Sequence, residues 1–183
     1  MASVGDVNEI LDLLSRAQQR GELRFLVIGG RGLEAHGIQR FTNDTDVLLA
    51  AAQMDKVGEV LRGGGFESLS ESPNFTRWRH RDPMIEILDV MRVNEGTFEK
   101  LWADSILFQA GGATLRAPSV RSYIALKIFA IQNNPDRFMK DMGDIASLFK
   151  GAQGKITVDD LRATCERYGT PELLARMMVS LGL

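Results

Sequence analysis

The chain has 183 residues, of which 44% are hydrophobic and 25% charged, a composition typical of one globular domain or of a domain with a small appendage. Its formal net charge is −2, so no overall basic charge favours nucleic acid as a partner. The single cysteine, Cys165, excludes an intramolecular disulfide, and the lack of a long apolar run or leader-like segment predicts a cytoplasmic protein without a membrane anchor.

The first part of the chain predicts helices alternating with strands. Residues 7–20 repeat apolar side chains at helical spacing and predict an amphipathic helix. The segment 24–30 (RFLVIGG) predicts a strand that runs into a glycine turn and a short helix. A second strand is expected to begin at Asp44 (DTDVLLAA), and residues 53–62 predict the next helix.

The remaining elements change in character at Pro118. Residues 75–80 and 84–91 predict strands, and 106–115 a hairpin. Helical spacing then follows in four segments, at 119–129, 137–149, 157–168 and 171–181. We therefore predict an α/β core over residues 1–117 and a helical region over 118–183.

Two aspartates open the strand that begins at residue 44. Because side chains at i and i+2 of a strand point the same way, Asp44 and Asp46 are expected to project together. Like charges so close repel unless a cation joins them, and carboxylate oxygens suit Mg²⁺. A third carboxylate would come from MIEILDVM, where Glu86 and Asp89 are expected on opposite faces. The alternative is a solvated strand start.

The pair Gly29-Gly30 follows a strand and precedes a helix. This order presents free backbone N–H groups to an anion such as a phosphate. The alternative is an ordinary tight turn. A phosphate cradle followed by a metal-binding pair is what transfer from a nucleoside triphosphate requires.

Three stretches resemble a known family. LVIGG…HGIQRFTNDTDVLL, MIEILDVMRVNEGTFEKLW and APSVRSYIALKIFA…RFMKDMGDIASL, spanning about residues 23–149, are similar to the minimal nucleotidyltransferases of the DNA polymerase β superfamily. The likeness is closest to the AbiEii-type toxin nucleotidyltransferases. It implies an α+β fold, a polymerase-β-like core with a mixed sheet followed by a small helical part.

The resemblance also assigns roles to individual residues. It implies metal ligands at Asp44, Asp46 and Glu86, with Glu86 preferred as third carboxylate and base, and Asp89 as the second choice. The residues implied to meet the nucleotide phosphates are Gly29, Gly30, Arg31 and Lys127. Asp141 and Asp144, three residues apart on one helix, would orient Lys127 or contact the acceptor.

The implied activity is transfer of NMP from an NTP to a hydroxyl group, with Mg²⁺ or Mn²⁺ as cofactor. The implied acceptor is RNA, including tRNA, or a protein, and the implied setting is the toxin of a toxin–antitoxin pair, with an antitoxin protein as partner. Two alternatives stay open. One is a non-catalytic nucleotide- or partner-binding module, suggested by Arg31 and by Glu rather than Asp at residue 86. The other is a small-molecule (antibiotic) adenylyltransferase. The short helical part argues against it, because little chain is left to build a deep substrate pocket.

The run RWRHR places Arg77, Arg79 and Arg81 on one face of a predicted strand and Trp78 on the other. Such a strand could grip an acceptor RNA through its phosphates, with Trp78 stacking on a base. The alternative is a solvated edge strand protected by its charges.

Overall fold

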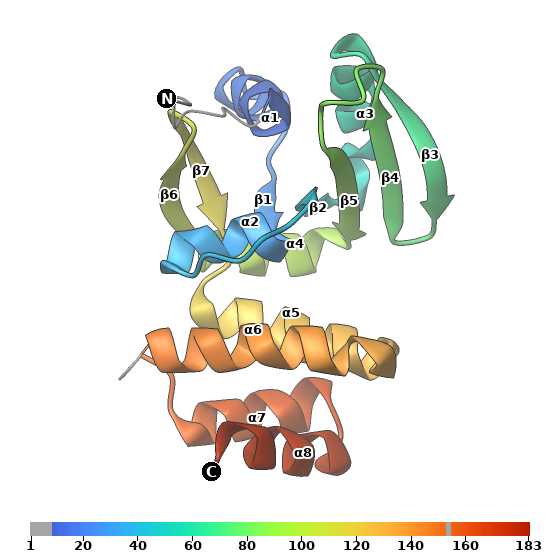
Figure 1. The fold of residues 1–183 in the computed structure, drawn as a ribbon. Helices are drawn as coiled ribbons and strands as arrows, with labels where there is room; N and C mark the ends of the chain where they lie inside the picture. The colour runs from blue at the N-terminus through green and yellow to red at the C-terminus, as the bar shows by residue number, and fades with distance from the viewer. Residues whose placement is uncertain (1–8, 153–154) are drawn as a thin grey trace. The chain divides into compact units, whose positions relative to one another are not determined.

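The computed structural model describes residues 9–152 and 155–183. Contacts divide the chain into two compact units. The core unit holds the described residues up to Ala35 together with Gln39–Pro118. The helical unit holds His36–Ile38 and the described residues from Ser119 to Leu183 (Figure 1). Each unit is described by itself.

The core unit is built on a mixed sheet with strand order β1-β2-β5-β4-β3. β2 and β5 pair in parallel and the other neighbours are antiparallel, which confirms the predicted mixed sheet. The five strands are β1 (Leu26–Ile28), β2 (Asp44–Ala50), β3 (Phe66–Ser72), β4 (Phe75–His80) and β5 (Ile87–Val93). The remaining elements of this unit are α1 (Glu9–Gln19), α2 (Gly29–Leu33), α3 (Met54–Gly63), α4 (Glu95–Ala103) and the hairpin of β6 (Ile106–Ala110) and β7 (Ala113–Ala117).

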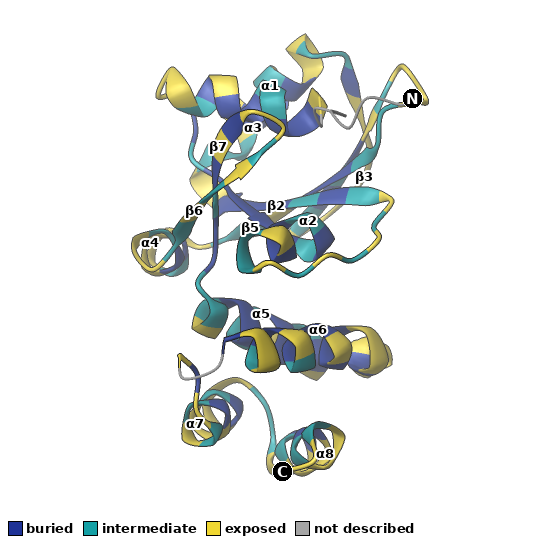
Figure 2. Cartoon of the chain, turned by 60° about the vertical axis from the view of Figure 1, so that its left-hand side comes forward, coloured by how far each residue is buried: buried dark blue, intermediate teal, exposed yellow. Residues whose placement is uncertain are grey.

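One face of the central strands is buried along its length. Thr45, Val47 and Leu49 of β2 are fully buried, and α1 and α3 lie on the same side of the sheet in both overall views (Figures 1 and 2). Arg62 of α3 lies over the ring of Trp78, 6.0 Å from its centroid. Because this face is apolar and covered, charged side chains on β2 are confined to its other face.

β5 begins later than the sequence predicts. The turn before it is fixed by Asp82, whose side chain accepts a hydrogen bond from the backbone N–H of Met84 (2.9 Å) and whose carbonyl accepts from Ile85 (3.2 Å). The strand therefore starts at Ile87 rather than at Met84. Glu86 lies just before the strand.

The helical unit contains the four predicted helices: α5 (Val120–Asn133), α6 (Phe138–Gly151), α7 (Val158–Tyr168) and α8 (Pro171–Leu181). Side-chain caps explain three of their starts. Ser119 accepts from the N–H of Ser122, Thr157 forms a capping box with Asp160, and Thr170 precedes Pro171 at the first helical position. In the part of the chain that the structure describes, none of the helices combines the length and apolarity needed to span a bilayer.

Candidate active site

Three aspartates share one face of the sheet. Asp44 and Asp46 lie two residues apart on β2, and the parallel pairing with β5 sets Asp46 opposite Asp89 and Asp44 opposite Ile87. Residues paired across neighbouring strands point to the same side, so Asp89 joins the aspartate pair. Asp89 is only 4% exposed, whereas Asp44 and Asp46 are partly exposed. Negative charge is therefore concentrated where β2 begins.

The glycine turn packs directly beside this pair. Gly29 has a φ of +64°, and a Cβ added to it would lie 1.9 Å from Oδ2 of Asp46. A Cβ on Gly30 would lie 2.8 Å from Cβ of Thr42. Only glycine tolerates both the backbone conformation and the contact at residue 29. The backbone of the turn is therefore a near neighbour of the Asp46 carboxylate.

Thr42 contacts the aspartate pair, although the sequence analysis did not include it among the candidate site residues. Its hydroxyl donates to Oδ1 of Asp44 at 2.6 Å and lies 3.2 Å from the Asp44 carbonyl oxygen. This contact restricts the Asp44 side chain. A threonine two residues before an aspartate, at the entry to a strand, is the local signal that could have revealed it.

Arg77 of β4 donates two hydrogen bonds to Asp89, from Nε to Oδ1 (2.8 Å) and from Nη2 to Oδ2 (2.6 Å). Hydrogen bonding to Asp89, assisted by the charges of Asp89, Asp44 and Asp46, raises the pKa of Arg77 above its ordinary value. Arg77 is thus a fixed cation on the aspartate face, because the register pairs it with Asp89 on the neighbouring strand.

Glu86 lies on the other side of the sheet from the aspartate pair. Its carboxylate accepts a hydrogen bond from the hydroxyl of the fully buried Thr45 (2.9 Å) and forms an ion pair with Arg31. Arg31 also lies 3.6 Å from Glu34. The preference for Glu86 beside Asp44 and Asp46 therefore has to be revised. The register brings Asp89 to that position because β5 begins only at Ile87.

The donor set on this face is chemically suited to a hard cation. Within residues 9–152 and 155–183, no group of three or more His, Cys, Asp or Glu side chains has a metal-holding arrangement. Asp44 and Asp46 nevertheless present two carboxylates on one face of β2. Mg²⁺ is commonly held by one or two carboxylates, with water and substrate phosphates completing its coordination. The two aspartates fit such an ion.

Lys127 is buried within the helical unit. It is 6% exposed, and its Nζ donates to Asp141 (2.8 Å) and to Asp144 (2.6 Å) on α6. Arg137 donates to the second oxygen of Asp141 at 2.7 Å. Burial alone would raise the pKa of Asp141, but hydrogen bonding from Arg137 and the nearby Lys127 charge outweigh it and lower that pKa. The structure brings these three predicted residues together as an ion-pair network.

The strand carrying RWRHR does not present its tryptophan to solvent. Trp78 is 4% exposed and lies on the buried face of β4, so it is not available to stack on an acceptor base. On the other face Arg77 pairs with Asp89, and Arg79 pairs with Glu67 at 2.6 Å. Stacking by Trp78, one of the two interpretations of this strand, does not hold, because the alternation that exposes the arginines buries Trp78. The alternative of an edge strand does not hold either, because β4 lies between β5 and β3.

Comparisons with solved structures place this fold among nucleotidyltransferases. An antigenic nucleotidyltransferase-like protein from Paracoccidioides brasiliensis is 13% identical with a TM-score of 0.61, covering 99% of this chain and 95% of its own. ANT(2")-Ia in complex with adenylyl-2"-tobramycin is 16% identical with a TM-score of 0.55, covering 96% and 97%. The lincosamide antibiotic adenylyltransferase LnuA, with lincomycin bound, is 16% identical with a TM-score of 0.55, covering 81% and 96%.

These identities establish the shared fold and leave substrate and activity to be argued from the site. No family model matches the chain, and no curated protein matches it. The chain therefore has an α+β nucleotidyltransferase fold, as the sequence predicted.

Proposed function

We propose that the protein is a divalent-metal-dependent nucleotidyltransferase that moves NMP from an NTP to a hydroxyl acceptor. The observation that carries the proposal is the shared face of Asp44, Asp46 and Asp89, created by the parallel register of β2 and β5. Carboxylates are rarely gathered in this way unless a cation or a proton joins them.

The proposed roles follow from position. Asp44, fixed by Thr42, and Asp46 would hold Mg²⁺ or Mn²⁺, and the backbone of Gly29 and Gly30 beside Asp46 would face the phosphates. The ion, when bound, supplies charge neutralisation for the triphosphate and favours ionisation of the attacking hydroxyl. Asp89 would accept the proton of that hydroxyl, with Arg77 keeping the carboxylate in place.

Glu86 and Arg31 would then support the site from the opposite face of the sheet. Their ion pair, together with the bond from Thr45 to Glu86, links the glycine turn to the start of β5. This arrangement balances the charge of Arg31, for which the resemblance implied a contact with the nucleotide phosphates. A direct role of Lys127 at the phosphates remains a prediction, because two of its three N–H groups are already directed at Asp141 and Asp144.

The acceptor class is proposed more broadly than the sequence suggested. RNA, tRNA and protein hydroxyls stay in the proposal, as does the AbiEii-type toxin setting with its antitoxin. The argument from the short helical part against a small-molecule acceptor does not hold. ANT(2")-Ia, whose structure contains adenylyl-2"-tobramycin, aligns over 97% of its own length with 96% of this chain. A chain of this size can therefore serve an antibiotic acceptor.

A non-catalytic module is the second candidate, and one observation favours it. Arg77 occupies both oxygens of Asp89, and Arg31 is paired with Glu86, so each candidate third carboxylate already has a cation. A nucleotide-binding module would bind NTP and metal without turnover.

The test is incubation with each α-labelled NTP and Mg²⁺ in the presence of bacterial RNA, lysate protein, or a panel of aminoglycosides and lincosamides. Transfer of label with release of pyrophosphate is expected for one acceptor class and is expected to vanish in Asp44→Asn/Asp46→Asn. Asp55→Asn/Asp159→Asn, which changes exposed aspartates by the same charge, is the control. Binding of NTP without transfer to any acceptor would favour the module.

A further inference from the structure

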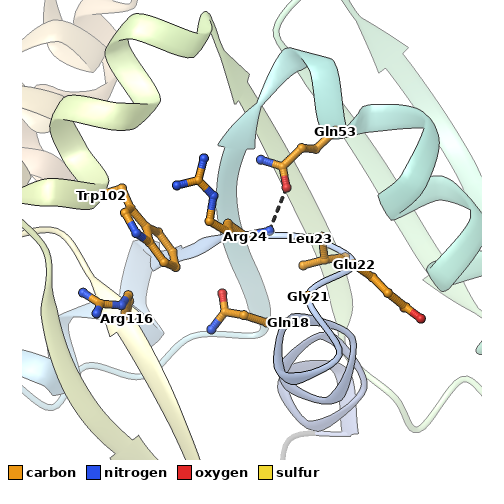
Figure 3. Close-up of a pocket in the computed structure, with 8 residues that line it drawn as sticks. All are labelled: Gln18, Gly21, Glu22, Leu23, Arg24, Gln53, Trp102 and Arg116. Atoms are coloured by element: carbon orange, nitrogen blue, oxygen red, sulfur yellow. Dashed lines mark hydrogen bonds between the residues drawn. The ribbon is translucent and has the colours of Figure 1, made fainter.

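A cavity lies in the core unit, at the end of the sheet away from the aspartates. β2 runs from Asp44 to Ala50, and Gln53 follows its far end, while Arg24 precedes the antiparallel β1. The cavity has a volume of about 440 Å³ (Figure 3). It is lined by Gln18, Gly21, Glu22, Leu23, Arg24, Gln53, Trp102 and Arg116.

Two glutamines in the lining have fixed amide orientations. Oε1 of Gln53 accepts from the backbone N–H of Arg24 at 2.7 Å, and Oε1 of Gln18 accepts from that of Phe25 at 3.3 Å. Because each oxygen is held by a backbone donor, each NH₂ group must point elsewhere. In Figure 3 the amide nitrogen of Gln53 is turned toward the side of Arg24 and Trp102. Neither amide nitrogen finds an acceptor among the residues that the structure describes.

The charged lining also has an excess of donors. The guanidinium carbons of Arg24 and Arg116 lie 5.3 Å and 4.8 Å from the centroid of the Trp102 ring. Arg24 is paired with Glu99, whereas Arg116 donates to the hydroxyl of Ser105 (2.9 Å) and has no carboxylate partner in the described chain. Arg116 therefore brings an unbalanced positive charge to the cavity.

The one carboxylate in the lining, Glu22, is already engaged. Arg20 donates to both of its oxygens, each at 3.0 Å. Hydrogen bonding from Arg20 lowers the pKa of Glu22, so this group is an ionised partner of Arg20. The cavity thus combines an aromatic wall, a guanidinium with no carboxylate partner among the described residues, and two amide groups that can donate.

We propose that this cavity binds a ligand through an oxyanion, either a phosphate or a carboxylate group. The NH₂ groups of Gln18 and Gln53 and the guanidinium of Arg116 would donate to its oxygens, and Trp102 would form the wall beside it. All three residues line the same cavity, and charge-assisted hydrogen bonds to an oxyanion are the strongest that such amide and guanidinium donors can form. The site is separate from the proposed nucleotide site and does not depend on it.

The test uses the indole N–H signals of the whole chain in two-dimensional NMR. Trp78 and Trp102 are its two tryptophans, and Trp102→Phe assigns the signals. Inorganic phosphate and acetate are titrated separately, with chloride holding ionic strength constant. A saturable shift of the Trp102 signal is expected with phosphate, with acetate or with both, which identifies the source of the oxyanion. No saturable shift with either anion would overturn the proposal.

Gln53→Glu is the decisive variant, because the glutamate keeps an oxygen for the Arg24 N–H and replaces the free donor with a negative oxygen. It should weaken anion binding about tenfold or more. Gln19→Glu is the control: it makes the same charge change on the exposed side of α1, where Gln19 donates only to Ser15. Equal weakening in both variants would mean general charge repulsion and would overturn the assignment of the site. Circular dichroism checks that both variants are folded.

Discussion

Asp89 of β5 stands directly opposite Asp46 of β2, and Arg77 holds it from the next strand. This pairing connects the proposed third carboxylate to the proposed metal-binding pair through the sheet itself, without a loop. It also means that the negative charge of the face is partly balanced by a protein cation. Asp89→Asn tests the contribution of the carboxylate, and Arg77→Met tests the contribution of the cation.

Asp89→Asn is expected to reduce nucleotidyl transfer about 100-fold or more, since it removes the proposed proton acceptor while preserving shape. Glu86→Gln should leave the rate within a few-fold of wild type, because Glu86 contacts Thr45 and Arg31 on the opposite face. Pyrophosphate release under saturating NTP measures both. A larger loss in Glu86→Gln than in Asp89→Asn would restore Glu86 as the third carboxylate.

Arg77→Met should lower the free energy of unfolding by about 2 kcal/mol in the absence of divalent metal, because Asp89 loses both charged hydrogen bonds. Added Mg²⁺ should recover more stability in this variant than in wild type, since the cation replaces the lost charge. Urea unfolding with and without Mg²⁺ measures the effect. The control is Arg79→Met on the same face, whose partner Glu67 is exposed; its loss should stay below about 1 kcal/mol. An identical Mg²⁺ response in both variants would argue against metal binding at this face.

Gly29→Ala should abolish transfer, because its Cβ would overlap the Asp46 carboxylate and force that side chain to move. Gly37→Ala is a matched control: Gly37 has a similar φ of +74°, but an added Cβ meets nothing within 4 Å. Both should lose about 1 kcal/mol of stability through the left-handed backbone, and Gly29→Ala should lose more because of the overlap with Asp46. Thermal unfolding and the transfer assay are read together. If both variants retain activity, the glycine turn has no contact with the reaction.

Lys127→Met should cost about 3 kcal/mol or more, because Asp141 and Asp144 would remain buried with only Arg137 as a cationic partner. Lys140→Met, an exposed substitution on the same helix as the aspartates, is expected to be nearly neutral. Urea unfolding at neutral pH measures both. If both variants lost the same stability, the ion pairs of Lys127 with Asp141 and Asp144 would contribute little to the free energy of unfolding.

The same network makes a pH prediction. The pKa of Asp141 is lowered in the folded state, so its contribution to stability is fully present above its ordinary value of about 3.9 and is lost as the pH falls through the lower folded value. The stability gap between wild type and Asp141→Asn should therefore be constant from pH 7 to about pH 5 and shrink below about pH 4. Urea unfolding at a series of pH values checks this. A gap that widens with acidification would reverse the sign of the assigned shift.

The sequence by itself determined what depends on neighbours along the chain. The i, i+2 spacing of Asp44 and Asp46 predicted a shared face, because alternation is a local property of a strand. The caps at Ser119, Thr157 and Thr170 are also local, since each side chain bonds a backbone group three residues away. The α/β core and the helical region were predicted from such local patterns, and the mixed sheet from the family resemblance.

Tertiary structure decided what depends on pairing between distant segments. The register of β2 against β5 and the late start of β5 put Asp89 rather than Glu86 beside Asp46. Packing against α3 buried Trp78, and the fold brought residues between 18 and 116 together around a cavity. A strand's sequence carries its own alternation but not its offset from a neighbour, because a shift of one residue changes every partner while leaving the local pattern intact.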